Sequence, residues 1–336
     1  MATDPPTTPN TLRVNGARFA ALLEAPVIAD ELGAEPGALV VDWSDGAVPA
    51  VPPQALGAMP VVVVGEGIGL DHPAAAWCDV VVPDGDAADK VVATVEAQSV
   101  AAAALAVLLR SADGRPPRST ADGLLAESAT YSVLQASPAH HAWLGTRPLG
   151  RSTRGDEPVV TLDLDGNRLV ITLARPEKRN AYNAQMRDEL LDALAVAEAD
   201  PALTLVELRG DGPSFSAGGD LDEFGSGSDP AANHVVRLAR STAAALDRLA
   251  DRVTAYVHGP CVGAGVELPA FVHRVVAAPD TTFRLPELAM GLVPGAGGTV
   301  SLPRRIGRHR TAWLALTGYP IDAPTAHRWG LVDSVT

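Results

Sequence analysis

The sequence predicts an α/β protein in which parallel strands are joined by crossover helices. Strand-like and helix-like segments alternate along the second half of the chain, and short apolar runs with β-branched residues recur in the first half. Repeated strand, helix, strand order is typical of crossover connections. With 336 residues and 47% hydrophobic content, the chain can bury a large core.

The chain divides at residues 149–157, where Gly, Pro, Arg and Ser gather between two more apolar regions. We interpret this segment as a linker. It separates an N-terminal region at 13–148, preceded by a polar and disordered tail at 1–12, from a core at 158–336.

The N-terminal region predicts two strands followed by two helices. Ala38–Trp43 and Pro60–Gly65 are continuous apolar runs, as expected for strands covered on both faces. The Ala-rich segment Asp86–Arg110 predicts one helix. A second helix is expected over Ser119–Gln135, with Ser119 or Thr120 as its N-cap.

The second half begins with a predicted β-hairpin, because Asp165, Gly166 and Asn167 form a turn signal between two strand-like runs. A helix capped by Asn183 follows. Strands are then expected at Thr204–Arg209 and Thr254–Val257, on either side of a helix over about Asn233–Ala250. The helix after Asn183 has one apolar stripe, formed by Met186, Leu190, Leu191, Leu194 and Ala197.

Composition excludes several functional classes. The formal net charge of -14 repels phosphate backbones, so nucleic acid is not an expected partner. No apolar run reaches the roughly 18 residues that a membrane span needs, and the N-terminus lacks the features of a signal peptide. We therefore expect a cytoplasmic protein without a membrane partner.

Cys78 and Cys261 give neither metal spacing nor a disulfide framework, and both are expected to be buried.

Two glutamates, twenty positions apart, lie in Gly-rich settings. Glu267 occurs in CVGAGVELPAF and Glu287 in FRLPELAMGLVPGAGG. Glycine allows the backbone to approach a ligand closely, and two carboxyl groups at one site can divide acid and base roles. This combination favours an enzyme.

Five segments occur in the order seen in one known family. They are RPEKRNAYN, FSAGGDLDEF, GPCVGAGVELPAF, FRLPELAMGLVPGAGGTVSLPRRIG and LTGYPIDAPTAHRWGLVDSV. From Val159 to Val335 the chain resembles the enoyl-CoA hydratase/isomerase (crotonase) superfamily. The resemblance implies a crotonase-like spiral of ββα units and an acyl-CoA substrate. It also implies a homo-oligomer, either a trimer or a hexamer, and no metal or other cofactor.

The resemblance also implies roles for particular residues. The backbone N–H groups of Gly219 and Ala264 would stabilise negative charge on a thioester oxygen. Glu267 would orient and deprotonate water, and Glu287 would deliver a proton to the α-carbon. The CoA moiety would be held around two segments, formed by Lys178, Arg179, Asn180 and Ala181 and by Ala217, Gly218, Asp220 and Leu221.

The leading functional hypothesis is an enoyl-CoA hydratase, which is a hydro-lyase. An isomerase that moves a double bond with one glutamate is the nearest alternative. A non-catalytic partner subunit is another alternative, motivated by Pro269 two residues after Glu267 and by Asp222 and Glu223, where many relatives have a basic residue.

The chain stops at Thr336, where typical relatives continue into helices that cover the active site. Segments before residue 150 resemble that missing sequel. We therefore hypothesise that residues 13–148 are a divergent crotonase-like half, whose helices from about Ala87 to Trp143 pack over or beside the catalytic half. One active site per chain is expected, and Glu66 and Glu127 are not regarded as substitutes for the pair.

Overall fold

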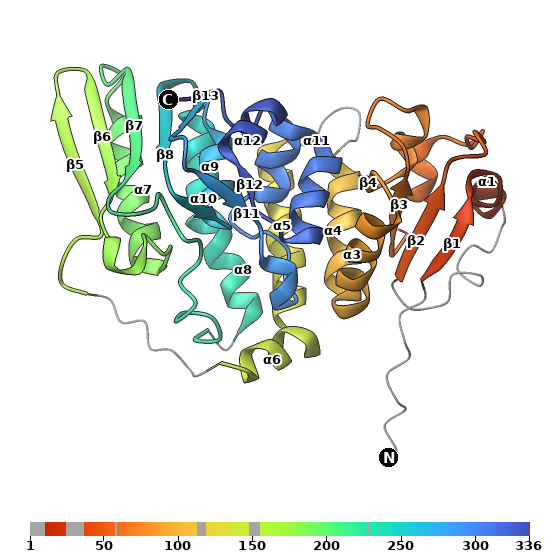
Figure 1. Ribbon diagram of the computed structural model, residues 1–336. Helices are drawn as coiled ribbons and strands as arrows, with labels where there is room; N and C mark the ends of the chain where they lie inside the picture. Colours follow the sequence, from red (N-terminus) through yellow and green to blue (C-terminus); the bar gives the residue numbers. More distant parts are fainter. Residues whose placement is uncertain (1–10, 25–36, 58, 113–118, 148–154, 228) are drawn as a thin grey trace, which may run out of the picture.

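The computed structural model describes residues 11–24, 37–57, 59–112, 119–147, 155–227 and 229–336. They form three sheets and the helices between them (Figure 1). The predicted tail lies mostly outside the described residues, but β1 (Leu12–Asn15) begins within its range. Most of the predicted linker also lies outside them.

A four-stranded parallel sheet forms the N-terminal region, in the order β1-β2-β3-β4. Its central strands, β2 (Gly37–Asp42) and β3 (Val61–Glu66), confirm the two predicted strands. Alternate side chains enter different clusters: Val40 and Val64 pack with α3 and α4, whereas Leu39 and Val63 pack with Phe19 of α1. The other elements are α1 (Gly16–Glu24), η1 (Pro53–Leu56), η2 (Pro73–Trp77) and β4 (Val80–Val82).

The single helix predicted over Asp86–Arg110 is wrong. α3 (Gly85–Ala97) and α4 (Ser99–Ala112) are separate and meet at an angle of 111°. Gln98 breaks the helix with φ −142° and ψ 49°. The bend lets α3 lie on the sheet while α4 packs against α11 (Figure 1). Among the described residues no single helix is long and apolar enough to cross a membrane. Within that part of the chain, only α3 and α4 taken together, as a bent pair, have the length and composition that such a span requires.

α5 (Thr120–Gln135) confirms the second predicted helix, and Ser119 caps it by accepting a hydrogen bond from Asp122 N at 3.1 Å. α6 (Pro138–Gly145) follows. α5 packs against α4, α8, α9 and α11, so this N-terminal helix lies against helices of the second half (Figure 1).

The second half contains a six-stranded sheet in the order β13-β10-β8-β7-β6-β5. Its β5–β6 pair is the predicted antiparallel hairpin, with Gly166 in the turn at φ +58°, and the other pairs are parallel. A small sheet, β12-β11-β9, lies beside it. The strands are β5 (Val160–Asp165), β6 (Arg168–Leu173), β7 (Leu205–Gly210), β8 (Val253–Val257), β9 (Pro260–Val262), β10 (Arg274–Ala277), β11 (Thr282–Arg284), β12 (Ile321–Asp322) and β13 (Ser334–Val335).

Asn183 caps α7 (Ala184–Ala199) as predicted, accepting from Met186 N at 2.8 Å. The helix predicted over Asn233–Ala250 is instead two helices, α8 (Pro230–Ala239) and α9 (Thr242–Arg248), because Ser241 caps a new helix. The remaining helices are η3 (Pro176–Lys178), η4 (Ala250–Arg252), α10 (Ala264–Glu267), η5 (Pro269–Phe271), η6 (Glu287–Met290), α11 (Gly298–Thr317) and α12 (Ala323–Trp329).

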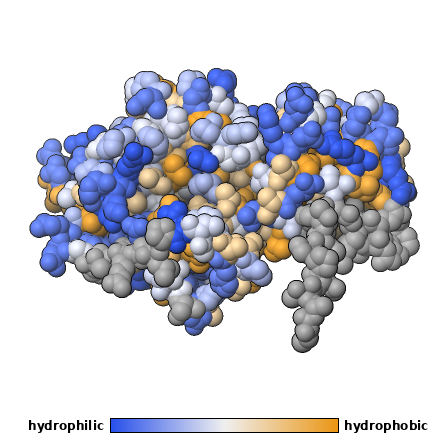
Figure 2. Space-filling view, turned by 60° about the horizontal axis from the view of Figure 1, so that its bottom comes forward, coloured by the Kyte–Doolittle hydropathy of each residue, from blue (hydrophilic) through white to orange (hydrophobic). Residues whose placement is uncertain are grey.

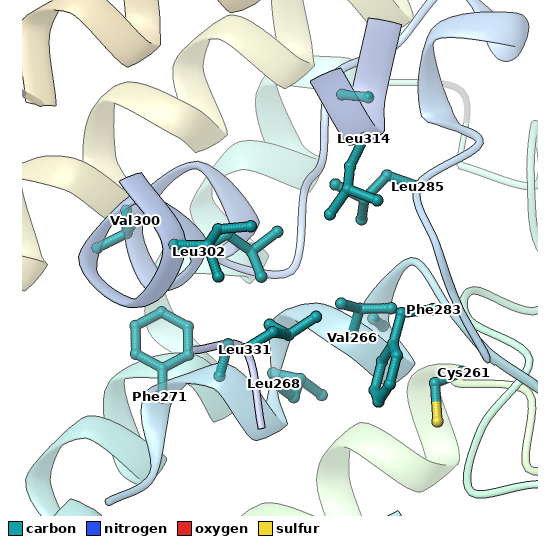
Figure 3. Close-up of a cluster of buried hydrophobic side chains, with 14 of the residues drawn as sticks. Cys261, Val266, Leu268, Phe271, Phe283, Leu285, Val300, Leu302, Leu314 and Leu331 are labelled. Atoms are coloured by element: carbon teal, nitrogen blue, oxygen red, sulfur yellow. The ribbon is translucent and has the colours of Figure 1, made fainter. Parts of the chain in front are cut away.

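α11 joins the two halves. On one side Val300 and Leu302 face Phe271, Leu331 and Leu268 across an apolar core (Figure 3). On another side Arg308 and His309 reach the N-terminal region, hydrogen bonding with the carbonyl oxygens of Ala76 at 2.7 Å and Ala75 at 2.8 Å. One continuous core cluster therefore contains residues from both halves.

Candidate active site

Two Gly-rich loops meet at the centre of the second half. Val262 N donates to Ser216 O at 3.1 Å, which ties the loop before α10 to the loop after β7. A Cβ added to Gly218 would lie 2.6 Å from Val262 O, and one added to Gly265 would lie 2.3 Å from Ser216 O. Only glycine permits so close an approach of two backbones.

The N–H groups of Gly219 and Ala264 lie on these two loops and line the same cavity. Within the described part of the chain, neither N–H donates a hydrogen bond to a protein acceptor. Backbone N–H groups in folded proteins nearly always have an acceptor, so this pair of free donors is available to a ligand oxygen. Their role as oxyanion donors stays a prediction.

Glu267 ends the short helix α10 and is only 2% exposed. Its Oε2 accepts hydrogen bonds from Ala296 N and Gly298 N, each at 2.8 Å. Burial, followed by the nearby carboxyls of Glu287 and Glu127, raises the pKa of Glu267 well above its usual value. Pro269, which the sequence marked as a departure, opens η5 and therefore does not interrupt a longer helix.

Glu287 opens η6 and is 8% exposed. Its Oε2 is buried and has no hydrogen-bond partner among the described residues. Burial raises its pKa to about 8. A Cβ added to Gly263 would lie 2.5 Å from Oε1 of Glu287 and 3.9 Å from Oε1 of Glu267. The two carboxyls therefore converge beside Gly263.

A third carboxyl, that of Glu127 on α5, joins the site. Its Oε1 accepts from Gly297 N at 2.7 Å, and its Oε2 accepts from Thr299 N at 2.8 Å and Thr299 Oγ1 at 2.7 Å. Burial raises the pKa of Glu127 to about 7. From the sequence we expected no second glutamate pair from Glu127, but we did not predict that Glu127 lies beside this site. The signal for it was the resemblance of its segment to the family's C-terminal helices.

The cavity has a volume of about 660 Å³. Besides the three glutamates and the two loops, it is lined by Tyr131, Trp143 and Arg147 from the N-terminal region and by residues of α7, α8 and α9. A cavity of this size, mostly apolar with a few converging polar groups, is typical of a small-molecule site.

The predicted CoA-binding residues fall into two groups. Ala217, Gly218, Asp220 and Leu221 line the cavity, whereas Lys178, Arg179, Asn180 and Ala181 are not among its lining residues. Lys178 pairs with Asp222 at 2.8 Å, and Arg175 pairs with Asp220 at 2.6 Å. Asn180 is fully buried, and its amide donates to the carbonyl oxygens of Asp211 and Ser214. These contacts give the turn at residues 178–181 a structural role.

About half of the chain matches one known family. Residues 165–336 match the family model described as enoyl-CoA hydratase/isomerase. The chain is 37% identical over 172 residues to mevalonyl-coenzyme A hydratase sidH of Aspergillus fumigatus and 35% identical over 167 residues to 2,3-dehydroadipyl-CoA hydratase of Escherichia coli. Each alignment covers 50% of this chain, and the chain spans 62% and 65% of those relatives.

Solved structures show the same likeness. An enoyl-CoA hydratase from Thermoplasma volcanium superposes with a TM-score of 0.50 at 34% identity, covering 54% of this chain and 72% of that one. The crotonase fold is thus the class of protein that the fold and the two loops define. The chain belongs to the enoyl-CoA hydratase/isomerase family.

Proposed function

We propose that this protein adds water across the double bond of a 2-enoyl-CoA. The observation that carries the proposal is the convergence of two buried carboxyls on Gly263, beside two backbone N–H groups that have no acceptor in the described part of the chain. The N–H groups of Gly219 and Ala264 would hold the thioester oxygen. Charge that develops on that oxygen is stabilised by donors already in place.

The two carboxyls differ in a way that suits different roles. Oε2 of Glu267 accepts from two N–H groups, which favour its carboxylate form although burial raises its pKa, so Oε1 can orient water and take its proton. Glu287 has a pKa of about 8 and an oxygen without a partner among the described residues, so it carries a proton near neutral pH. The hydroxide adds to the β-carbon, and the proton of Glu287 goes to the α-carbon. No metal or other cofactor is needed for this step.

The test is to mix the purified chain with a trans-2-enoyl-CoA and follow the ultraviolet absorbance of the conjugated thioester. We expect loss of absorbance in the wild type and at least a hundredfold slower loss in Glu287→Gln, since the variant cannot donate a proton. Circular dichroism and thermal unfolding must show that the variant is folded. If the wild-type chain alone has no activity, the hydratase proposal fails and a non-catalytic partner subunit is favoured.

Isomerisation is a second candidate, because the buried Oε2 of Glu287 has no hydrogen-bond partner among the described residues, so this one carboxyl could carry a proton between two carbons. One relative, 35% identical, is named 1,2-epoxyphenylacetyl-CoA isomerase of Escherichia coli. Incubation of a 3-enoyl-CoA distinguishes the two, since an isomerase creates the conjugated absorbance that a hydratase removes.

We also propose self-association, as a trimer or hexamer. Large apolar side chains are exposed on α5 and α8: Val133 at 71%, Val235 at 63% and Val236 at 41%. Apolar residues also appear among hydrophilic ones on the face shown in Figure 2. Light scattering after size-exclusion chromatography tests this, and a monomer at micromolar concentration would contradict it.

A further inference from the structure

We propose that Arg237 and Tyr131 form an anion-binding subsite of the cavity, which takes a carboxylate at the far end of the substrate's acyl chain. This inference rests on the proposed function, because it assumes that the cavity holds an acyl thioester. It adds to that function the chemical class of the acyl group.

Arg237 lies on α8, and its guanidinium reaches neutral acceptors on one face of α5. Nε donates to Ser128 Oγ at 3.1 Å, Nη1 donates to Gln135 Oε1 at 3.2 Å, and Nη2 donates to Ser128 O at 3.3 Å and to Ser132 Oγ. These bonds fix the plane of the guanidinium. Of its five N–H groups, one on Nη1 has no acceptor among the described residues.

Among the described residues Arg237 forms no ion pair within 4 Å, and the Glu127 carboxyl attracts its charge only at longer range. The other arginines that line the cavity on this side, Arg187 and Arg240, both pair with Asp188, at 2.8 and 2.7 Å. Burial lowers the pKa of Arg237, which shows that its surroundings disfavour the charge. A partly buried cation in a ligand cavity is stabilised when the ligand supplies an anion.

Tyr131 connects this charge to the reaction centre. The guanidinium carbon of Arg237 lies 4.7 Å from the centroid of the Tyr131 ring. The ring packs on Gly295, where an added Cβ would lie 2.3 Å from Cε2 of Tyr131. Gly295 precedes Ala296, whose N–H donates to Glu267. The same aromatic ring thus contacts both Arg237 and the loop that holds Glu267.

The Tyr131 hydroxyl is a second donor for the same anion. Within the described residues it has no hydrogen-bond partner, and Tyr131 lines the cavity. Burial raises the pKa of this hydroxyl, so it stays protonated and can donate. A carboxylate that accepts from a hydroxyl and a guanidinium forms charge-assisted hydrogen bonds, which are about twice as strong as neutral ones.

The position of the subsite favours the acyl chain over the phosphates as the source of the anion. The phosphates of CoA are separated from the thioester by the whole pantetheine arm, whereas Arg237 packs on a ring that contacts the loop holding Glu267. A chain ending in a methyl group would leave the guanidinium unpaired and remove water from it, which is costly.

Calorimetric titration with adipoyl-CoA and hexanoyl-CoA tests the subsite without requiring turnover. These ligands have six-carbon chains and differ only in the terminal carboxylate or methyl group. We expect the wild type to bind adipoyl-CoA at least about tenfold more tightly. Arg237→Met should reduce that preference to about one while hexanoyl-CoA affinity stays within about threefold. Tyr131→Phe, which keeps the packing ring, should reduce the preference by a smaller factor.

Arg248→Met is the matched control, because it removes an exposed arginine of α9 that pairs with Glu198 outside the cavity. It should leave the preference unchanged. The titrations are repeated with four- and eight-carbon pairs. The subsite is refuted if the wild type prefers no carboxylate at any length, or if Arg237→Met weakens both ligands of a pair equally.

Pantetheine thioesters of the same acids, which lack the nucleotide phosphates, identify the source of the anion. The carboxylate preference and its dependence on Arg237 should persist in them. If Arg237→Met affects only the full CoA ligands, the arginine serves a phosphate and the inference is wrong. If the protein does not hydrate an enoyl-CoA but still prefers the carboxylate ligand, the proposed reaction is wrong and the subsite is supported.

Discussion

Glu127 and Glu267 accept hydrogen bonds from alternate N–H groups of one loop. Ala296 and Gly298 donate to Glu267, whereas Gly297 and Thr299 donate to Glu127. The two carboxyls come from different halves of the chain and hold the start of α11 between them. The orientation of Glu267 therefore depends on a residue 140 positions earlier in the sequence.

Replacing Glu127 with Gln should loosen this loop. The amide nitrogen of Gln cannot accept from Gly297 or Thr299, so at least one buried N–H loses its partner, at a cost of about 1–3 kcal/mol. We expect a similar drop in the free energy of urea unfolding and a roughly tenfold to hundredfold drop in kcat. Glu198→Gln, on the surface of α7, is the control. Unchanged kcat with lowered stability would show that Glu127 only supports the fold.

Substitution of Gly263 with Ala should displace Glu287. Gly263 has φ +49°, and an added Cβ would lie 2.5 Å from the carboxyl oxygen of Glu287. Gly166→Ala is a matched control, because Gly166 has φ +58° but nothing within 4 Å of an added Cβ. Gly166→Ala should lose about 1 kcal/mol of stability from backbone strain, and Gly263→Ala should lose more, because its added Cβ also clashes with Glu287. Only Gly263→Ala should lose most of its kcat, and equal activities in the two variants would contradict the proposed geometry.

The dependence of stability on pH should differ between the wild type and Glu287→Gln. The pKa of Glu287 is raised from 4.5 to about 8, so the folded state holds a proton that the unfolded state releases. Its contribution to stability is complete below pH 4.5 and is lost as pH rises toward 8. The neutral Gln carries no such dependence. Urea unfolding at several pH values should therefore show the wild type losing stability relative to the variant between pH 4.5 and 8, and a constant difference would refute the raised pKa.

Asp79 should be essential for the N-terminal sheet. Its side chain is buried, and its Oδ2 lies 2.5 Å from Nη2 of Arg110. Removal of one partner from a buried ion pair leaves an uncompensated charge and costs about 3–5 kcal/mol. We expect Asp79→Ala to lower the free energy of unfolding by about that amount. Asp86→Ala, in the exposed first turn of α3, should change it by less than about 0.5 kcal/mol. If Asp79→Ala lowers the free energy of unfolding only slightly, water must compensate the charge of Arg110.

Local signals in the sequence predicted much of the fold. The caps Ser119 and Asn183 and the turn at Gly166 act within a few residues, so they could be recognised without tertiary information. The break at Gln98 offered no such signal, and it lets α4 reach α11, a contact that depends on the whole fold. The break at Arg240 did have a local signal, because Ser241 caps α9, and the prediction missed it.

The sequence also predicted only part of the site. The glutamate pair and the Gly-rich loops stand in segments that resemble the family. Pairing of Lys178 with Asp222 joins residues 44 positions apart, and Glu127 reaches a loop about 170 positions away. No local pattern shows which distant charge a side chain will meet.

The contribution of α5 to the cavity has a consequence for dissecting the protein. A cut between residues 147 and 155 would divide the wall of the cavity itself, because Glu127 and Tyr131 would remain on one fragment and Glu267 and Glu287 on the other. If the proposed hydration takes place there, neither fragment should catalyse it alone, and activity should return only when the two fragments recombine.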